Sequence, residues 1–409
     1  MRPELTLAIF LLAYALIATR RLALLPIGRP AGALLGAVLM VALGSLTPEA
    51  AYDAIDGPTL VVLFGTMALS AYVDARGLFD RLLRIALRVA HTPLRLLWLL
   101  AFMPGVLSAL LLNDAVCLFL TPLVVRACKA SRLPFEPYLL ALATSANLGS
   151  AATLVGNPQN MLVGSLGDLD FGRFLLAVGP VALLGLVLNA MVLHAFYARR
   201  LPARFEADAF SSEPSTDRGW QLAFVVVSSL GLALVLGANL PFAVLAAVLV
   251  FVVVDRRDPQ ETFARIDLAL LVFFASLFVV VEGLRATGYV DAVWEWARGG
   301  LGTESLGQTA SFTAVIALGS NTVSNVPLVL LVAPYVDALG DPVRTWTLLA
   351  WVSTVAGNLT LVGSAANVIV AEAAKSEHDL GFWAYARVGV PSTILVLATG
   401  TPIVWWLAG

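Results

Sequence analysis

Charged side chains are scarce in this sequence. Of its 409 residues only 13% are charged and 59% are hydrophobic, whereas a soluble globular domain carries about 25% charged residues. The net charge of −2, with only two lysines at Lys129 and Lys375, leaves no basic surface that would attract nucleic acid. This composition excludes a soluble enzyme, a disordered chain and a nucleic-acid-binding protein.

Residues that bind metals or form disulfides are equally few. The chain has two cysteines, Cys117 and Cys128, both in or beside an apolar stretch, and three widely separated histidines, His91, His194 and His378. This pattern argues against a disulfide scaffold and against a cysteine-based zinc site. We therefore expect no bound cofactor. The sequence also offers no group of residues that would bind a catalytic metal ion.

Long apolar runs are what the sequence does contain. Charge-free stretches occupy 5–19, 30–48, 57–73, 96–113, 137–167, 174–193, 219–254, 268–281, 305–336, 345–371 and 388–409. A helix needs about 20 residues to cross the hydrocarbon core of a bilayer, so several of these runs are expected to be spans. The first run is followed by no small-residue cleavage site, and we interpret it as a first helix and not as a signal peptide.

The second half of the chain repeats the first at an offset near 210 residues. The segment 113–122 matches 325–334, the tetrapeptide Thr-Leu-Val-Gly at 153–156 recurs at 360–363, and an asparagine follows four residues after each Gly, at Asn160 and Asn367. Three matches in the same order predict a duplication. We expect a first membrane repeat over 1–198, a cytoplasmic linker over 199–218 and a second, inverted membrane repeat over 219–409.

Each repeat is expected to hold three helices, a hairpin, an interrupted helix and a final helix, which makes the chain an all-α integral membrane protein. The first repeat places these at about 5–20, 30–47, 58–75, 98–125, 137–164 and 173–198, and the second at about 219–237, 240–254, 267–285, 305–336, 345–372 and 383–407. Charged and apolar residues alternate at helical spacing over 80–90, which predicts an amphipathic helix along the membrane interface.

The distribution of basic residues predicts how the chain crosses the membrane. If both hairpins re-enter without crossing, each repeat crosses five times, and an external N-terminus places 20 of the 25 basic residues in or beside cytoplasmic loops. An odd number of crossings inverts the second repeat and leaves both termini outside. Inverted repeats whose broken helices meet at the midplane are an architecture of secondary transporters, so we expect a multi-pass protein of the cell's inner (plasma) membrane.

Polar residues interrupt the apolar pattern at four places: two hairpin tips and two broken helices rich in Gly, Asn and Pro. Unwound backbone at membrane depth is tolerated only against protein or a water-filled cavity, and it can hold ions and solutes. The alternative is that these residues serve close helix packing and interhelical hydrogen bonds. The substrate-binding candidates are Asn113, Asp114, Ser145, Asn147, Asn321, Thr322, Asn325 and Asn358; the ion-coupling candidates are Asp114, Gly156, Asn157, Asn160, Gly363, Ser364 and Asn367.

Asp114 is the one carboxylate in the middle of an apolar segment, between uncharged runs 96–113 and 115–125. A charge at the bilayer centre costs about 2.5–3.5 kcal/mol on insertion scales, so it is expected to face a cavity and to serve transport. The alternative is a structural cap of the second helix of the hairpin. Its counterpart in the second repeat is Val326, so a proton or cation site here would be asymmetric.

These motifs resemble those of the ion transporter superfamily, which includes divalent anion/sodium symporters, arsenite permeases and citrate transporters. The symporters carry Ser-Asn-Thr at each hairpin tip, whereas this chain has Leu112-Asn113-Asp114 and Ser324-Asn325-Val326. The segments LLNDAVCLFLTP, SANLGSAATLVGNPQN and AGNLTLVGSAANVIVAE look closer to arsenite permeases and plant silicon efflux transporters.

The resemblance implies a fold and a working arrangement. The fold is two inverted repeats with one inward-opening and one outward-opening hairpin, in a protein that forms homodimers and moves a substrate-bearing domain against a scaffold. Substrate would lie between the tips at Asn113 and Asn325, with ion sites at Gly156-Asn157 and Gly363-Ser364.

The function that fits best is secondary active transport of a small inorganic anion or neutral oxyacid, such as arsenite or silicic acid, coupled to protons or sodium. No Lys or Arg lies within the four polar clusters, which favours a neutral or singly charged solute. The alternatives are a sodium-coupled di- or tricarboxylate symporter and a sodium/proton antiporter that uses Asp114. A channel is a further alternative, but paired broken helices favour alternating access. An enzyme would need a nucleophile–base pair or metal cluster, and an ATP-driven pump a Walker-type loop, and the sequence has none of these.

Overall fold

A computed structural model describes residues 3–18, 28–204, 219–255 and 258–409. All regular structure in these four ranges is helical, and no strand occurs in them. This confirms the all-α fold class. The predicted first helix ends at Ala18, and most of the predicted linker, 205–218, lies outside the described residues.

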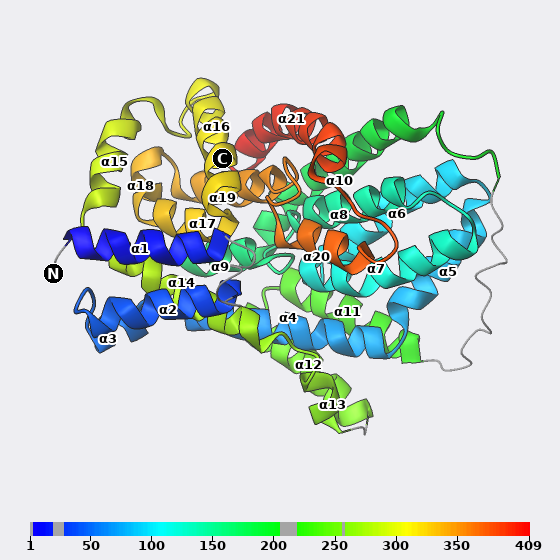
Figure 1. The fold of residues 1–409 in the computed structure, drawn as a ribbon, viewed down its shortest axis with the longest axis horizontal. Coiled ribbons are helices and arrows are strands. Elements are labelled where there is room, and N and C mark those ends of the chain that lie inside the picture. Colours follow the sequence, from blue (N-terminus) through cyan, green and yellow to red (C-terminus); the bar gives the residue numbers. More distant parts are fainter. Residues whose placement is uncertain (1–2, 19–27, 205–218, 256–257) are drawn as a thin grey trace.

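Figure 1 shows the helices in chain order. The first half contains α1 (Pro3–Ala18), α2 (Arg29–Ala42), α3 (Pro48–Asp53), α4 (Gly57–Ala75), α5 (Leu78–Ala90), α6 (Pro93–Ser108), α7 (Asn113–Ala130), α8 (Phe135–Ser150), α9 (Pro158–Leu166) and α10 (Phe171–Tyr197). The amphipathic helix expected over 80–90 is α5. The expected hairpin is α6–α7, and the expected interrupted helix is α8–α9.

The second half follows the same order. It contains α11 (Gly219–Val235), α12 (Leu240–Asp255), α13 (Pro259–Phe263), α14 (Leu268–Arg285), α15 (Tyr289–Ala297), the 3₁₀ turn η2 (Arg298–Gly300), α16 (Leu306–Val323), α17 (Asn325–Val332), the 3₁₀ turn η3 (Ala333–Tyr335), α18 (Val336–Leu339), α19 (Pro342–Ala356), α20 (Ala365–Ala374) and α21 (Phe382–Leu407). The short helices α3 and α13 and the helix α15 were not anticipated from the sequence.

Equivalent local signals start equivalent helices in the two halves. Asp56 caps α4 by accepting a hydrogen bond from Thr59 N at 2.7 Å, and Asp267 caps α14 by accepting one from Leu270 N at 3.1 Å. Gly77 and Gly288 adopt positive φ values of 72° and 76° directly before α5 and α15, a conformation that glycine reaches without steric cost. The two halves therefore share their turns as well as their helix order.

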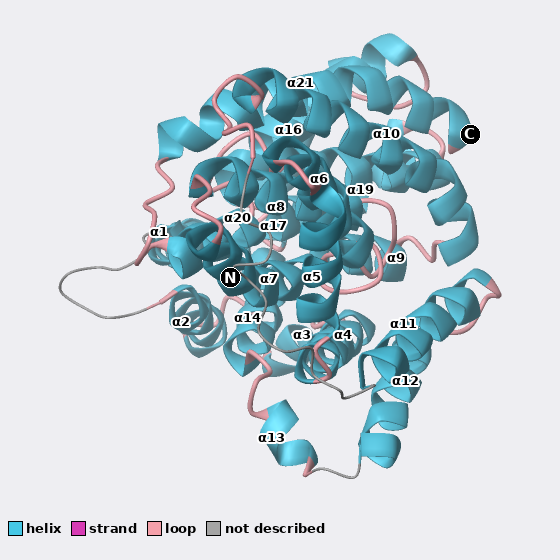
Figure 2. Cartoon of the chain, turned by 90° about the vertical axis from the view of Figure 1, so that its right-hand side faces the viewer, coloured by secondary structure: helices cyan, strands magenta, loops and turns pink. Residues whose placement is uncertain are grey.

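Most of the helices fall into two groups by their packing. In Figure 2, α2, α4, α11, α12 and α14 lie in the lower half of the view, and α10, α16 and α21 lie in the upper half. The scaffold group contains α1, α2, α4, α11, α12 and α14, in which α2 packs on α1 and α14, and α4 packs on α12. The hairpin group contains α6–α10 and α16–α21, with its closest packing between α6 and α8, between α10 and α21 and between α7 and α20. All four predicted polar breaks lie in the hairpin group.

Close helix packing in the hairpin group depends on small residues. A Cβ added to Gly149 of α8 would lie 2.0 Å from the carbonyl oxygen of Gly105 in α6, so a side chain at this crossing would force the two helices apart. Small residues at helix crossings are the usual means of tight packing in membranes.

The lengths of the helices fit a multi-pass membrane protein. Among the described residues, four helices, α4, α10, α14 and α21, are at least 18 residues long and apolar enough to cross a bilayer, and seven shorter helices are also apolar. The number of crossings expected from the charge distribution, five in each half, stays a prediction.

Candidate solute site

Four interruptions of helical structure form the site. Residues 109–112 separate α6 from α7, Ser324 separates α16 from α17, residues 151–157 separate α8 from α9, and residues 357–364 separate α19 from α20. Hydrogen bonds connect each hairpin tip to the broken helix of its own half. Further hydrogen bonds connect the two broken helices to each other.

The breaks are held by one asparagine each. Asn160 Nδ2 donates hydrogen bonds to the carbonyl oxygens of Thr153 (2.9 Å) and Ser150 (3.3 Å). Asn367 Nδ2 donates to the carbonyl oxygens of Thr360 (3.2 Å) and Gly357 (2.9 Å). These partners occupy equivalent positions, because the Thr-Leu-Val-Gly tetrapeptides begin at Thr153 and Thr360. The two side chains thus satisfy carbonyls that the broken helices leave without a helical donor.

The two breaks also brace each other across the halves. The Thr354 hydroxyl donates to Asn160 Oδ1 at 3.0 Å, and Asn147 Nδ2 lies 3.5 Å from Asn367 Oδ1. Asn147 Nδ2 also donates to Asn358 Oδ1 at 3.0 Å. Polar residues from both halves therefore form one buried network.

Each hairpin tip is fastened to the break of its own half by the tetrapeptide threonine. The Thr153 hydroxyl donates to the carbonyl oxygen of Ala109 at 2.5 Å, and the Thr360 hydroxyl donates to Asn321 Oδ1 at 3.0 Å. The first tip is further held by a bond from Asn113 N to the Gly156 carbonyl at 2.9 Å.

The two tips differ in backbone geometry. Four residues form the first tip, whereas only Ser324 separates α16 from α17, and it adopts φ 76° and ψ 157°. A positive φ is uncommon for a residue other than glycine and stores strain. The second tip is therefore the tighter and more strained of the two.

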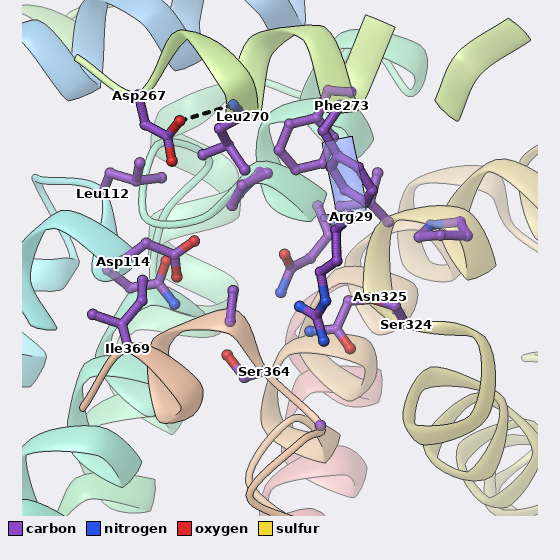
Figure 3. Close-up of a pocket in the computed structure, with 18 of the residues that line it drawn as sticks. Arg29, Leu112, Asp114, Asp267, Leu270, Phe273, Ser324, Asn325, Ser364 and Ile369 are labelled. Atoms are coloured by element: carbon purple, nitrogen blue, oxygen red, sulfur yellow. Dashed lines mark hydrogen bonds between the residues drawn. The ribbon is translucent and has the colours of Figure 1, made fainter. Parts of the chain in front are cut away.

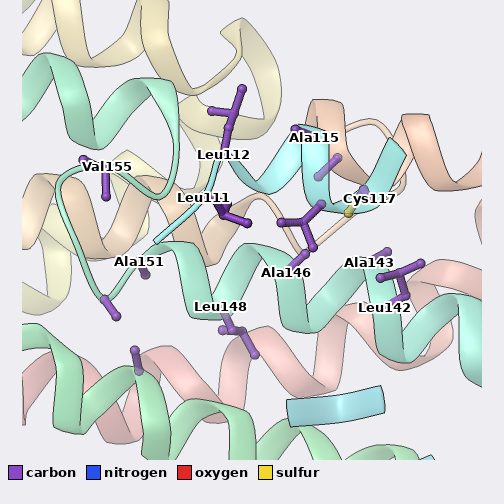
Figure 4. Close-up of a cluster of buried hydrophobic side chains, with 14 of the residues drawn as sticks. Leu111, Leu112, Ala115, Cys117, Leu142, Ala143, Ala146, Leu148, Ala151 and Val155 are labelled. Carbon is purple, nitrogen blue, oxygen red and sulfur yellow. The ribbon is translucent and has the colours of Figure 1, made fainter. Parts of the chain in front are cut away.

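Apolar side chains surround the first tip, and one of them, Leu112, also lines the cavity. Leu111 and Leu112 pack in the buried core with Ala146 and Leu148 of α8 (Figure 4). The polar groups of this tip are thus surrounded by hydrocarbon except where they meet the buried network and the cavity.

A cavity of about 460 Å³ lies between the tips and the scaffold group. Seven of the fourteen predicted site residues line it: Asn113, Asp114, Asn321, Thr322, Asn325, Gly363 and Ser364. The other seven, Ser145, Asn147, Gly156, Asn157, Asn160, Asn358 and Asn367, are not among its lining residues. Those seven are buried behind the cavity wall, where several of them belong to the network that supports it.

Asp114 faces this cavity from the first turn of α7 (Figure 3). Helix α7 begins after Leu112 with no side-chain cap, so the alternative that Asp114 caps it is wrong. Asp114 is 9% exposed, and no hydrogen bond to its carboxylate is found within the described ranges. Asp267 and Arg29 also line this cavity.

Arg29 and Arg265 were not predicted to belong to the site, because they flank spans far from the hairpins in sequence. Both line the cavity, and Arg29 extends toward Ser324 and Asn325 from the side opposite Asp114 (Figure 3). Arg265 pairs with Asp74 at 3.4 Å. The four polar segments of the sequence contain no arginine. In the folded protein, however, Arg29 from another segment lies beside the second tip.

Hydrogen-bond acceptors and donors occupy opposite sides of the cavity. Asn113 Nδ2 donates to Asn147 Oδ1 at 2.9 Å, while Asn113 Oδ1 is buried and has no partner among the described residues. On the second tip the Ser320 hydroxyl donates to Asn325 Oδ1, which leaves Asn325 Nδ2 as a donor. The Asp114 carboxylate is therefore the acceptor that faces the cavity from the first tip, and Asn113 Oδ1 is a buried acceptor at the same tip. The second tip offers an amide donor near the Arg29 guanidinium.

Comparison with known proteins decides the family. The sequence model of the citrate transporter family, CitMHS, matches residues 14–356. The chain belongs to the citrate transporter family. It is therefore a transporter and not an enzyme, and the resemblance to the ion transporter superfamily is confirmed.

Relatives within this group carry names that describe transport of inorganic solutes. The chain is 34% identical to the silicon efflux transporter LSI3 of Oryza sativa subsp. japonica, over 93% of this chain and 93% of that protein. It is 31% identical to the putative transporter arsB of Dictyostelium discoideum, over 93% of this chain and 88% of that protein.

A solved structure has the same fold. The crystal structure of the Alcanivorax borkumensis YdaH transporter, described by its title as having an unusual topology, matches with a TM-score of 0.58 and 17% sequence identity. The match covers 99% of this chain and 98% of that one. At this identity the likeness shows the fold alone.

Proposed function

We propose that this protein is a secondary active transporter of a small inorganic oxyacid or its singly charged anion, with arsenite or silicic acid as the type of solute. Coupling is to protons or sodium, and the mechanism is alternating access, in which the hairpin group moves against the scaffold group.

The observation that carries the proposal is the pairing of acceptors on one tip with donors on the other. A neutral oxyacid is covered with hydroxyl groups, and each hydroxyl donates one hydrogen bond and accepts others. Asn113 Oδ1, buried without a partner, needs such a donor, because an unsatisfied buried acceptor costs about 1–3 kcal/mol. Asn325 Oδ1 already accepts from Ser320, so its Nδ2 is the atom that can donate to a solute oxygen.

The same arrangement argues against a di- or tricarboxylate solute. An ionised carboxylate only accepts hydrogen bonds. A solute carboxylate near the first tip would find two further acceptors there, Asn113 Oδ1 and the Asp114 carboxylate, and it would be repelled by the negative charge of Asp114. The name of the family mentions citrate, but the relatives at 31–34% identity are named for silicon efflux and as an arsB transporter.

Asp114 is the proposed coupling group, with Gly156, Asn157, Asn160, Gly363, Ser364 and Asn367 supporting it in the two breaks. Its carboxylate faces the cavity without a hydrogen-bond partner within the described ranges, so it is placed to take up a proton or Na⁺. A sodium/proton antiporter remains the second candidate, because a lone cavity carboxylate suits that activity equally.

The proposed setting is the plasma membrane, with two inverted repeats of five crossings, the linker in the cytoplasm, both termini outside and a homodimeric assembly. In this topology Arg29, Arg265 and Asp267 stand at the cytoplasmic ends of their helices. Because all three line the cavity, this topology implies a cavity that opens toward the cytoplasm.

Purified protein in proteoliposomes tests the function. Labelled arsenite, germanic acid as an analogue of silicic acid, and citrate are offered in separate experiments, with sodium and pH gradients imposed one at a time. We expect arsenite or germanic acid to accumulate against its gradient with one of the two ion gradients. Accumulation of citrate alone would support the carboxylate alternative, and sodium/proton exchange without solute movement would support the antiporter.

A further inference from the structure

The cavity has walls from both helix groups, and the scaffold group contributes a charged residue close to the second hairpin tip. The polar residues of the tips and breaks that line it, such as Asn113, Asp114 and Asn325, belong to the hairpin group, whereas Arg29 is the first residue of α2 in the scaffold group. Figure 3 shows its guanidinium group beside Asn325 and Ser324, across the cavity from Asp114. Scaffold and hairpin residues thus face a common space.

The position of Arg29 is fixed by tight packing within the scaffold. A Cβ added to Gly32 of α2 would lie 2.8 Å from Leu16 Cβ, and one added to Gly36 would lie 2.6 Å from Ala13 Cβ. Helix α2 is therefore pressed directly against α1 through its glycine face. A residue at the start of α2 moves with the scaffold and not with the hairpins.

Two further scaffold charges line the cavity, Arg265 and Asp267. Arg265 is paired with Asp74 at 3.4 Å and its side chain is 53% exposed at the mouth. Asp267 caps α14 through Leu270 N at 3.1 Å. Of the three, Arg29 is the one that Figure 3 shows beside Ser324 and Asn325 of the second tip.

We propose that Arg29 is a solute-binding residue that the scaffold contributes only when the site faces the side on which this cavity opens. The inference rests on the proposed function, because it takes the solute to be an oxyacid or its anion. The guanidinium group donates hydrogen bonds to a solute oxygen from one side, while Asn113 and Asp114 accept from solute hydroxyls on the other.

This arrangement makes the affinity of the site different on the two sides of the membrane. Arginine stays charged at all relevant pH values and its planar group presents several donors to one oxyanion. When the hairpin group carries the solute away from the scaffold, Arg29 stays behind and the solute keeps only neutral donors. The solute is therefore bound more tightly from the cavity side and released more easily on the other.

The test measures half-saturating solute concentrations from each side of the membrane in proteoliposomes of known orientation. A Lys129→Cys background marks orientation with a membrane-impermeant maleimide, because Lys129 is 64% exposed and both native cysteines are buried. Arsenite is the first probe and citrate the second. The variants are Arg29→Gln, which keeps a hydrogen-bonding side chain without charge, Arg29→Lys, which keeps the charge, and Arg265→Gln, which removes the charge at the mouth.

We expect Arg29→Gln to raise the half-saturating concentration about tenfold or more on the cavity side and to leave the other side within about twofold. Arg29→Lys is expected to restore part of the loss, and Arg265→Gln to have a clearly smaller effect than Arg29→Gln. An equal shift on both sides, no shift, or an equal effect of Arg265→Gln would overturn the proposal.

The outcomes separate this inference from the proposed function. If the wild type moves citrate and not arsenite, the oxyacid function fails, while the sidedness of Arg29→Gln is still measured with citrate. If arsenite moves but Arg29→Gln shows no sidedness, the function stands and the role of Arg29 falls. A wild-type protein that moves neither probe would overturn both.

Discussion

The Thr354 hydroxyl donates a hydrogen bond of 3.0 Å to Asn160 Oδ1, and through it the broken helix of the second half supports that of the first. Asn160 in turn holds the unwound carbonyls of its own break. The breaks are therefore rigid structures in which side chains replace the helical hydrogen bonds, and this has consequences for both stability and transport.

Loss of the asparagines that hold the breaks is expected to destabilise the protein. Asn160→Ala and Asn367→Ala each leave two buried carbonyls without their donor, at a cost of about 1–3 kcal/mol. Thermal unfolding in detergent should show a lower midpoint for both variants. Asn239→Ala removes one exposed hydrogen bond from Phe242 N at the start of α12, 3.4 Å long, and as the control should lower the midpoint less than either of them. Midpoints equal to that of the wild type would contradict the structural role of the two asparagines.

The asparagines of the tips are expected to serve transport and not stability alone. Asn113→Ala and Asn325→Ala should each reduce solute uptake at least tenfold, because they remove the acceptor on one side of the cavity and the donor on the other. Size-exclusion profiles and helical content should match the wild type, which separates loss of binding from loss of folding. Uptake kinetics like those of the wild type in both variants would refute the site.

The two hairpins are expected to enter from opposite sides of the membrane. In a background without native cysteines, Lys129→Cys after the first hairpin should react with an impermeant maleimide from the cytoplasm only. Val343→Cys after the second hairpin should react from outside only. Both positions are exposed, at 64% and 51%, so the reagent can reach them. Labelling of residues 126–136 from outside alone would show that the topology is inverted.

Strain at the second tip gives a further expectation. Ser324 has a φ of 76°, so Ser324→Gly should relieve strain and raise the thermal midpoint, whereas Ser324→Val should lower it, since a β-branched residue tolerates this conformation poorly. If the wild type and Ser324→Gly unfolded at the same temperature, Ser324 would not be strained in the folded protein.

The broken helices and hairpin tips could be predicted from the sequence because their signal is local. Gly, Asn and Pro gathered within apolar runs at 145–160 and 353–367 mark unwound backbone, and the repetition of Thr153-Leu154-Val155-Gly156 marks its counterpart. The helix α5 was predicted for the same reason, since its charged and apolar residues alternate at helical spacing.

The parts that were missed depend on tertiary packing. Arg29 begins a helix more than 80 residues before Asn113 in the sequence, and only the packing of α2 on α1 and α14 brings it to the cavity. Nor could the pattern show that Asn147 and Asn160 face the supporting network instead of the cavity, because both positions are simply polar residues in an apolar run. The alternative that Asp114 caps α7 is wrong because Leu112, and not Asp114, occupies the N-cap position of this helix.

The measurement that tests the account most directly is gradient-driven accumulation of arsenite by the Asp114→Asn variant. Asparagine keeps the size of the side chain and most of its hydrogen-bonding capacity but cannot carry the proton or bind Na⁺ as a carboxylate. We predict that the variant still binds arsenite and exchanges it across the membrane but loses accumulation against a gradient, with no dependence on imposed pH or sodium gradients. Accumulation equal to that of the wild type, with the same ion dependence, would place the coupling site elsewhere and contradict the account.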